Sequence, residues 1–268
     1  MIVVKNQDQI AAMRVAGRLT GETLAYAHSL VREGVSTKYL DTKIREFIEK
    51  HGAKPSFLGL YGFPASACIS VNEEVIHGIP SEKRILTEGD IVSIDVGACY
   101  RGFHGDSART FPVGHVSNEA LKLMAVTKQS FMEGAKMAIA QNRVGDIGSR
   151  VEAVVKDAGF SVVRNFVGHG VGKDLHEDPE VPNFGTAGRG VRLYPGMTIA
   201  IEPMVNVGTH TVETLSNQWT VVTMDRKLSA HYENTVLITM SKQEFLTGEG
   251  DSCTKKRKDI LYGKGRFD

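Results

Sequence analysis

The two halves of this 268-residue chain carry the same landmarks at a constant separation of 107 positions. Apolar residues at helical spacing, followed by a glycine, occur at Leu40, Ile44, Ile48 and Gly52, and again at Ile147, Val151, Val155 and Gly159. A glycine, the end of an apolar run and a carboxylate occur at Gly89, Ile94 and Asp95, and again at Gly196, Ile201 and Glu202. Apolar spacing alone repeats in every amphipathic helix. The evidence for a repeat is therefore the glycines and carboxylates that share the same offset. The repeat predicts two similar halves, each with a helix pair, a sheet and an acidic strand end, and a site between them.

The order of the predicted elements indicates the fold class. Helical spacing predicts a first helix over residues 7–32, and Ser36 or Thr37 is expected to cap a second. Ser117 and Asp146 are expected to open two more helices. Strand-like runs occupy residues 68–71, 91–94, 161–167, 197–205, 219–223 and 235–239. Helix pairs followed by runs of strands are typical of an α+β layer fold.

No low-complexity linker separates the two halves. We therefore expect one domain over residues 1–242, with halves of about 1–112 and 113–242, followed by a basic C-terminal extension over residues 243–268.

The composition argues against several classes of protein. A hydrophobic content of 41% and a charged content of 24% are those of a globular protein, and a net charge of +1 gives no reason to expect a membrane or nucleic acid. Residues 1–10 contain no apolar signal-peptide run, and no stretch approaches the ~20 apolar residues of a membrane helix. Three widely spaced cysteines without a CxxC pair predict free thiols and a cytoplasmic location.

Two aspartates lie in neighbouring strand-like segments, with residues 97–102 as the expected hairpin connection. A turn centred between Tyr100 and Arg101 would place Asp95 directly opposite Asp106, whereas a turn made by Arg101 and Gly102 would make them diagonal neighbours on the same face. Two carboxylates this close repel each other unless one is protonated or a cation lies between them. A cation is the better interpretation if other ligands come from elsewhere in the chain.

The second half contains such ligands. His169 lies between two glycines, which leaves an imidazole accessible, although taken alone it is better explained as a histidine in a surface turn. Glu202 ends one apolar run and Glu233 begins another, and either could simply meet an arginine. Four carboxylates and one histidine together suit Mn²⁺, Fe²⁺, Co²⁺ or Zn²⁺. They are too many for one tetrahedral zinc, so we expect two divalent ions roughly 3.5–4 Å apart with a bridging water that ionises near neutral pH.

From about residue 3 to residue 240 the chain resembles the type I methionine aminopeptidases of the bacterial cytosolic kind. The resemblance is carried by Asn72-Glu73-Glu74-Val75-Ile76-His77-Gly78-Ile79-Pro80, Ser93-Ile94-Asp95-Val96, Gly105-Asp106, Gly168-His169-Gly170, Leu175-His176-Glu177, Ile201-Glu202-Pro203 and His231-Tyr232-Glu233-Asn234. It implies the pita-bread α+β fold, with pseudo-two-fold symmetry and an antiparallel sheet core flanked by two helix pairs. It also implies a metal-dependent hydrolase that removes the initiator methionine from nascent proteins whose second residue is small.

The resemblance assigns roles to individual residues. The implied ligands of two divalent ions are Asp95, Asp106, His169, Glu202 and Glu233, with Asp106 and Glu233 bridging the ions. Glu202 would also be the general base that takes a proton from the attacking water, which bridges the ions. His176 would hydrogen-bond the scissile carbonyl, and His77 would position the peptide beyond the scissile bond and assist proton transfer.

The resemblance also implies a pocket for the methionine side chain, formed by Phe57, Leu60, Phe63, Cys68, Leu175 and Trp219. Trp219, the only tryptophan, could equally be a core residue, and Cys68 could be either an apolar wall or a reactive thiol. A further site for Na⁺ or K⁺, made of backbone oxygens, would fall near Asn72, Glu74 and Ser229.

Other functions were weighed against this one. A proline-directed aminopeptidase or dipeptidase usually carries a large extra N-terminal domain, for which this chain has no room. A catalytically inactive relative that only binds partners is disfavoured because all five ligand positions hold ligating side chains. A metallophosphatase is disfavoured because no Arg/Lys cluster accompanies the ligand motifs. Eukaryotic and type II forms are disfavoured because no zinc-finger extension precedes residue 1 and no long insert separates His169 from Glu202.

We expect a monomer that acts on the N-terminus of nascent polypeptides, with no membrane partner and no specific nucleic-acid partner. The tail, with Lys255-Lys256-Arg257-Lys258, Lys264 and Arg266, matches no motif of the family. Such a tail is usually a solvated end. We hypothesise that it contacts ribosomal RNA, which equal ribosome binding after deletion of residues 249–268 would disprove.

Overall fold

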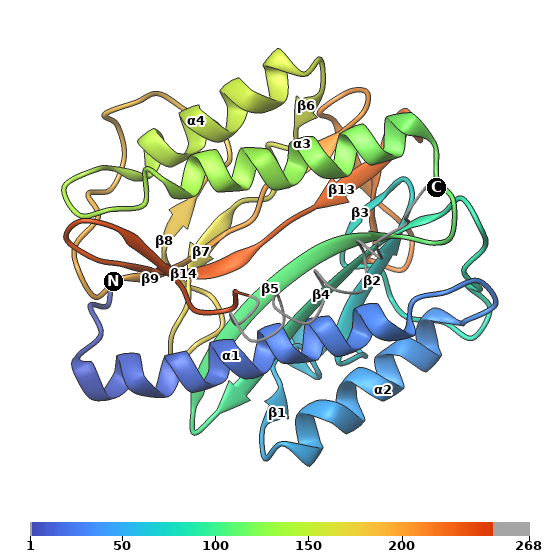
Figure 1. Cartoon of the computed structure of the whole chain (residues 1–268), viewed down its shortest axis with the longest axis horizontal. Helices are drawn as coiled ribbons and strands as arrows, with labels where there is room; N and C mark the ends of the chain where they lie inside the picture. Colours follow the sequence, from blue (N-terminus) through green and yellow to red (C-terminus); the bar gives the residue numbers. More distant parts are fainter. Residues whose placement is uncertain (1, 249–268) are drawn as a thin grey trace, which may run out of the picture.

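The computed structural model describes residues 2–248 and has two helix pairs with the sheets between them (Figure 1). The helices are α1 (Gln7–Leu30), α2 (Thr37–Lys50), α3 (Asn118–Ala135) and α4 (Val144–Asp157), with a short 3₁₀ turn η1 (Leu60–Gly62). Figure 1 shows the α1/α2 pair along one side of the strands and the α3/α4 pair along the other. The basic tail at residues 255–266 lies outside the described residues.

The strands form four sheets, and every strand pairing among residues 2–248 is antiparallel. The first has the order β1-β4-β2, with β5 also paired to β4; its strands are β1 (Lys54–Pro55), β2 (Ala67–Val71), β4 (Ile91–Tyr100) and β5 (Phe103–Pro112). The largest has the order β15-β14-β9-β7-β8; its strands are β7 (Gly168–Gly170), β8 (Glu177–Val181), β9 (Thr198–Ile201), β14 (Asn234–Ile238) and β15 (Gln243–Phe245). The two small sheets are β13-β10-β6 and β11-β12-β3, made of β3 (Glu74–Ile76), β6 (Ser161–Val162), β10 (Met204–Asn206), β11 (Val212–Thr214), β12 (Val221–Thr223) and β13 (Ser229–His231).

The 107-residue repeat is present in the structure. Helix α4 begins and ends 107 positions after α2, and β9 begins 107 positions after β4. The glycines after the two helices have φ of 74° at Gly52 and 84° at Gly159, and those before the two strands have 95° at Gly89 and 88° at Gly196. All four adopt the left-handed backbone that glycine reaches without strain. The predicted α+β fold in two similar halves is therefore confirmed.

Side-chain caps set most of the helix starts. The Ser36 hydroxyl accepts a hydrogen bond from the Tyr39 amide, and Ser117 caps α3 in the same way. The fourth helix begins two residues earlier than predicted, at Val144, because the Asp146 carboxylate reaches back to the Arg143 amide at 2.7 Å. Asp146 is thus the third residue of the helix and supplies the capping contact from inside it.

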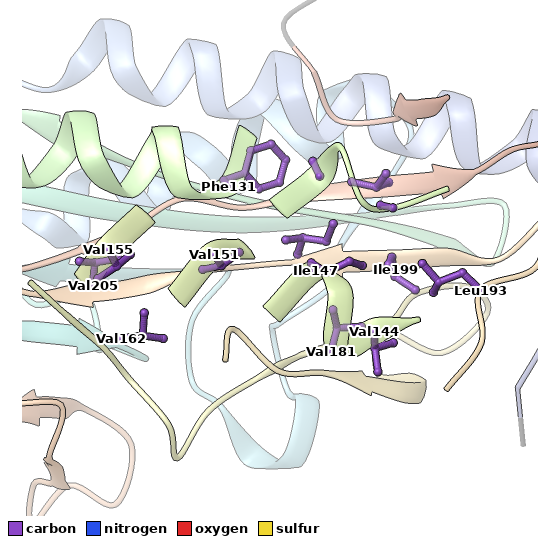
Figure 2. Close-up of a cluster of buried hydrophobic side chains, with 14 of the residues drawn as sticks. Phe131, Val144, Ile147, Val151, Val155, Val162, Val181, Leu193, Ile199 and Val205 are labelled. Atoms are coloured by element: carbon purple, nitrogen blue, oxygen red, sulfur yellow. The ribbon is translucent and has the colours of Figure 1, made fainter. Parts of the chain in front are cut away.

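Each helix pair buries its own apolar core. Figure 2 shows the core of the second half, where Val151 and Ile147 of α4 lie near Phe131 of α3 and the strands. The core of the first half contains Leu40 and Ile44 of α2 packed with residues of β2 and β4. Each half thus has its own apolar core, built in the same way from a helix pair and a sheet. This similarity accounts for the equal lengths and matching positions of α2 and α4.

Two predicted strands differ in the structure. The run 161–167 forms a strand only at β6, and the run 197–205 is divided into β9 and β10 by Glu202 and Pro203. A proline lacks the amide that continuous pairing requires. The segment from residue 243, which we assigned to the extension, forms β15, and Leu246 is buried with Ile10 and Met13 of α1. None of the helices within residues 2–248 is long and apolar enough to span a membrane.

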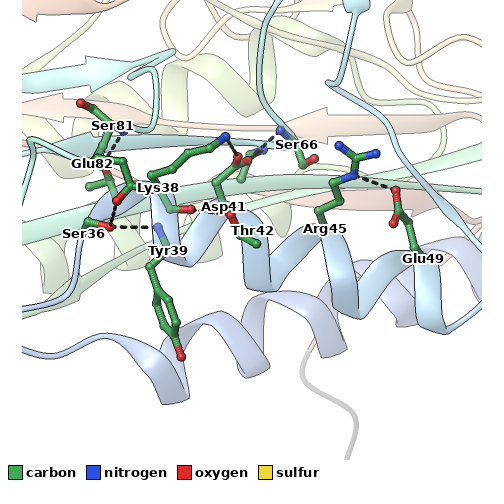
Figure 3. A network of polar contacts seen from close by, with 12 residues as sticks. Ser36, Lys38, Tyr39, Asp41, Thr42, Arg45, Glu49, Ser66, Ser81 and Glu82 are labelled. Carbon is green, nitrogen blue, oxygen red and sulfur yellow. Dashed lines mark hydrogen bonds and ion pairs between the residues drawn. The ribbon is translucent and has the colours of Figure 1, made fainter.

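A buried carboxylate ties α2 to the start of β2. Asp41 is 3% exposed, and its Oδ1 accepts hydrogen bonds from the backbone amides of Ser66 at 2.8 Å and Ala67 at 3.1 Å. Its Oδ2 pairs with Lys38 Nζ at 2.7 Å, as Figure 3 shows. This contact fixes the segment that leads into Cys68.

Replacing Asp41 with alanine should destabilise the protein by about 2–4 kcal/mol, since it leaves two buried amides without an acceptor and removes hydrogen bonds to a charged group. Urea unfolding followed by circular dichroism measures this. Glu46 on the same helix is the control, because its pair with Lys43 is 58% exposed on the Glu46 side and should contribute less than about 1 kcal/mol. Equal losses from Asp41→Ala and Glu46→Ala would contradict the assignment.

Candidate metal centre

The register of the β4–β5 hairpin settles how the two aspartates lie. Tyr100 pairs with Phe103, so the turn consists of Arg101 and Gly102, with φ of 50° and 78°. Asp106 lies opposite Gly97 and Asp95 opposite Ala108, so the aspartates are diagonal neighbours on one face. The wider connection that we predicted over residues 97–102 is wrong. Both strands continue to a two-residue turn with positive φ at both positions, which matches the twist of a hairpin.

Asp95 and Asp106 therefore lie inside strands and not at strand ends. Glu202 does follow the end of β9, and Glu233 lies between β13 and β14. The Glu233 amide donates to the Ala108 carbonyl at 2.9 Å, and the Ser107 hydroxyl donates to the Glu233 carbonyl at 2.8 Å. These bonds hold Glu233 against the strand that carries Asp106.

His169 lies in strand β7, not in a surface turn. A Cβ at Gly168 would lie 2.3 Å from the Ala200 carbonyl oxygen, and one at Gly170 would lie 2.3 Å from that of Asp178. The two glycines thus permit close strand contacts and do not serve to expose the imidazole, whose side chain is 14% exposed. The Nδ1 of His169 is 2.8 Å from the Gly170 carbonyl, which fixes the proton on Nδ1 and leaves the Nε2 lone pair free. That Nε2 lies 3.7 Å from Asp106 Oδ2 and 3.5 Å from Glu202 Oε1.

Three of the five predicted ligands form the tightest group. One ligand atom from each of Asp106, His169 and Glu233 lies within 4.8 Å of the other two. Glu202 reaches this group through its contact with His169, and Asp95 reaches it as the diagonal neighbour of Asp106. The structure therefore brings all five residues to one place.

Burial raises the pKa of all four carboxyls. It raises the pKa of Asp106 to about 7. The pKa values of Asp95, Glu202 and Glu233 are raised well above their ordinary values, first by burial and then by the neighbouring carboxylates. Asp95 Oδ1, Asp106 Oδ1 and Glu233 Oε1 are buried and have no hydrogen-bond partner within residues 2–248. A set of four oxygen donors and one nitrogen with unsatisfied acceptors fits divalent cations.

These raised pKa values predict how the metal-free protein responds to pH. The folded state retains protons that the unfolded state loses above about pH 4, so stability should fall as pH rises toward and through 7. After chelation, the melting temperature should fall between about pH 5 and 8, and saturating Mn²⁺ should remove most of that fall.

The control for this measurement is Asp106→Asn, which carries no titrating group at that position and should flatten the metal-free curve. A metal-free wild-type curve that runs parallel to the Asp106→Asn curve would contradict the assignment.

His231 belongs to the site although it received no role from the sequence. It is 2% exposed, and its Nε2 has no hydrogen-bond partner within the described residues. That Nε2 lies 3.7 Å from Glu202 Oε2. Burial lowers the pKa of His231 to about 3, so the ring is neutral. One feature of the sequence could have indicated a role for His231: it lies two residues before Glu233, and alternate residues of an extended segment share a face.

The four carboxylates line a cavity of about 720 Å³. All six residues of the predicted methionine pocket line it: Phe57, Leu60, Phe63, Cys68, Leu175 and Trp219. They also form one apolar cluster, in which Trp219 lies edge-on to Phe63 with ring centroids 5.1 Å apart. Burial raises the pKa of the Cys68 thiol well above its usual value, which favours an apolar wall over a reactive thiol.

Both remaining histidines predicted for catalysis also line the cavity. The His176 ring is perpendicular to that of His169 with centroids 4.4 Å apart, and it is stacked with the Tyr61 ring at a centroid distance of 5.9 Å. His77 lies edge-on to Phe166 and to Trp219. Burial lowers the pKa of His176 and lowers that of His77 to about 4, so both rings are neutral near pH 7.

None of the three residues suggested for a monovalent cation lines the cavity that the carboxylates line. The Asn72 carbonyl accepts a hydrogen bond from the Ser229 amide at 2.9 Å, and the Glu74 carboxylate accepts one from the Val71 amide at 2.7 Å. The structure thus places Asn72 beside Ser229, and Glu74 begins β3 after the turn at residues 72–73.

Known proteins match both this sequence and this arrangement. The model of metallopeptidase family M24 matches residues 11–240. The chain belongs to family M24, and within it to the methionine aminopeptidases. The methionine aminopeptidase of Clostridium perfringens is 57% identical over 92% of this chain and 99% of its own length. The crystal structure of the Thermotoga maritima methionine aminopeptidase superposes with a TM-score of 0.91 at 42% identity, covering 93% of this chain and all of that one.

A more distant M24 structure shares the fold alone. The prolidase of Pyrococcus furiosus gives a TM-score of 0.76 at 23% identity, covering 92% of this chain and 66% of the prolidase. The pita-bread fold that the sequence implied is therefore confirmed for this M24 chain.

Proposed function

We propose that this M24 methionine aminopeptidase removes the initiator methionine from nascent proteins whose second residue is small. The observation that carries the proposal is the junction of two features in one cavity: a buried group of carboxylates with one histidine, and an apolar pocket beside it. The donor set supports a hydrolytic metal site, and the pocket supports an unbranched apolar side chain next to the bond that is cut.

Asp95, Asp106, His169, Glu202 and Glu233 would hold two divalent ions, of Mn²⁺, Fe²⁺, Co²⁺ or Zn²⁺. Such ions supply positive charge that polarises a carbonyl and lowers the pKa of water. Asp106 and Glu233, the most buried of the carboxylates at 3% and 2% exposed, are the proposed bridging ligands.

Glu202 is the proposed general base. Its carboxylate lies between the imidazoles of His169 and His231, at 3.5 Å and 3.7 Å, which restricts its position. A carboxylate held in one position within reach of a bound water can accept a proton from it and pass that proton on. We propose that it takes a proton from the attacking water and delivers it to the leaving amine.

His176 and His77 are proposed to bind the substrate. Because its pKa is lowered, His176 remains neutral near pH 7 and can donate one N–H to the scissile carbonyl oxygen as negative charge develops there. His77, held edge-on by Trp219, would position the peptide beyond the scissile bond and assist proton transfer. A Na⁺ or K⁺ ion near Asn72, Glu74 and Ser229, and contact of the tail with the ribosome, remain part of the proposal.

The experiment that tests this function uses metal-depleted protein restored singly with Mn²⁺, Fe²⁺, Co²⁺ or Zn²⁺. Release of free methionine from Met-Ala-Ser should return with at least one metal, and release from a matched peptide with a bulky second residue should be much slower. Peptides that start with proline or carry proline second test the prolidase alternative. Equal turnover of Met-Ala-Ser and Met-Leu-Ser, or cleavage of the proline peptides alone, would contradict the proposal.

A further inference from the structure

A buried ion pair connects the first residues of the chain to the cavity. Lys5 Nζ lies 2.6 Å from Glu177 Oε2, and the two side chains are 2% and 9% exposed. The Lys5 amide also donates to the Gly196 carbonyl at 2.9 Å, which anchors the backbone of Lys5 to the start of β9. The pair thus joins positions 172 residues apart.

Glu177, the first residue of β8, directly follows the turn that presents two cavity residues. Its other oxygen, Oε1, accepts a hydrogen bond from the Asp174 amide at 3.4 Å and so closes the turn that carries Leu175 and His176. The same carboxylate lies over Gly172, where a Cβ would come within 2.2 Å of Oε1. The Gly172 carbonyl in turn accepts the His104 amide at 2.9 Å.

The Lys5 ammonium group reaches a second wall of the cavity. It donates to the Val3 carbonyl at 3.4 Å, and Val3 lines the cavity. Burial lowers the pKa of Lys5, and Glu177 opposes that effect. Removing one partner of such a pair leaves the other charge buried without compensation, so the local geometry must change.

We propose that Lys5 is a positioning residue of the peptidase site: it fixes the turn that carries Leu175 and His176 and holds the Val3 segment against the same cavity. The proposal rests on the function proposed above. Lys5 does not touch the reacting atoms and acts through Glu177. Without Lys5 the turn is expected to shift, His176 to lose its alignment and the pocket wall at Leu175 to loosen.

A double-mutant cycle with His176 tests the proposal. Lys5→Met should lower kcat for Met-Ala-Ser by about 10- to 100-fold, the cost of a small displacement of a catalytic group. In the His176→Ala background the same Lys5→Met change should lower kcat by less than about 3-fold, since there is no imidazole left to misplace. A loss that multiplies with that of His176→Ala would show a general structural effect and overturn the proposal.

Two further variants keep the result interpretable. Arg14→Met removes an ion pair of the N-terminal helix with Glu244 that does not line the cavity, and it should leave kcat unchanged. If Lys5→Met does not fold, Glu177→Gln keeps the shape of the side chain but removes the charge that pairs with Lys5, and it should show a smaller loss with the same dependence on His176. Full activity of Glu177→Gln would overturn the proposal. A wild-type protein that releases no methionine would overturn the proposed function itself, and the inference with it.

Discussion

Replacing Glu202 with glutamine should lower kcat for Met-Ala-Ser by about 10²–10⁴-fold, the range for loss of a general base. Glutamine keeps the shape of the side chain between His169 and His231 but cannot accept a proton. The KM should change far less than kcat, because the apolar pocket that binds the substrate side chain is untouched. Steady-state kinetics at saturating Mn²⁺, with metal content measured on the same samples, checks this.

The matched control for Glu202 is Glu180, an exposed carboxylate that also lines the cavity. Glu180→Gln should leave kcat within about 3-fold of wild type, as expected for a surface change away from the reacting groups. If Glu202→Gln retains full metal content and a kcat close to wild type, Glu202 is not the base.

Replacing His176 with alanine should lower kcat by about 10²–10³-fold, the cost of losing one preorganised donor to a developing oxyanion. The ring lies edge-on to His169 at 4.4 Å and stacks with Tyr61 at 5.9 Å, and these two contacts restrict its orientation before substrate binds. His176→Asn, which restores an N–H donor on a shorter side chain, should recover part of the loss. Pre-steady-state measurement of methionine release separates the chemical step from product release.

His115→Ala serves as the control for His176→Ala. The His115 side chain is 99% exposed and pairs only weakly with Glu88 on the surface. It should leave kcat unchanged. If His176→Ala raises KM without lowering kcat, the residue contributes to binding but not to stabilisation of the transition state.

Some of this molecule follows from short-range sequence signals. The apolar spacing and terminal glycines of α2 and α4 are local, and they predicted both helices, whose observed bounds coincide at an offset of 107 residues. The pairing of Asp95 with Asp106 was limited to two registers because a hairpin turn and a two-residue side-chain period leave few choices. Arg101 and Gly102 then decided between those two registers.

Glycine-flanked His169 and the carboxylates at the ends of apolar runs marked candidate ligands in the second half, whereas the resemblance assigned their roles and named the pocket. The glycines around His169 were misread from the sequence, because the reason for them lies in carbonyls of strands that are distant along the chain. His231 was given no role for a related reason. What identifies it as a site residue is its contact with Glu202, and that contact exists only because β10 pairs with β13 in the folded chain.

The sequence by itself determined the helices, the two-half plan and one acidic hairpin, because helical spacing, glycine conformation and strand alternation act within a few residues. Only the tertiary structure decided that five distant side chains meet beside an apolar cavity, and that Lys5 pairs with Glu177 under one wall of it. Those contacts depend on sheet register and on the docking of two separate cores. Both are properties of the whole chain, and no short stretch of residues encodes them.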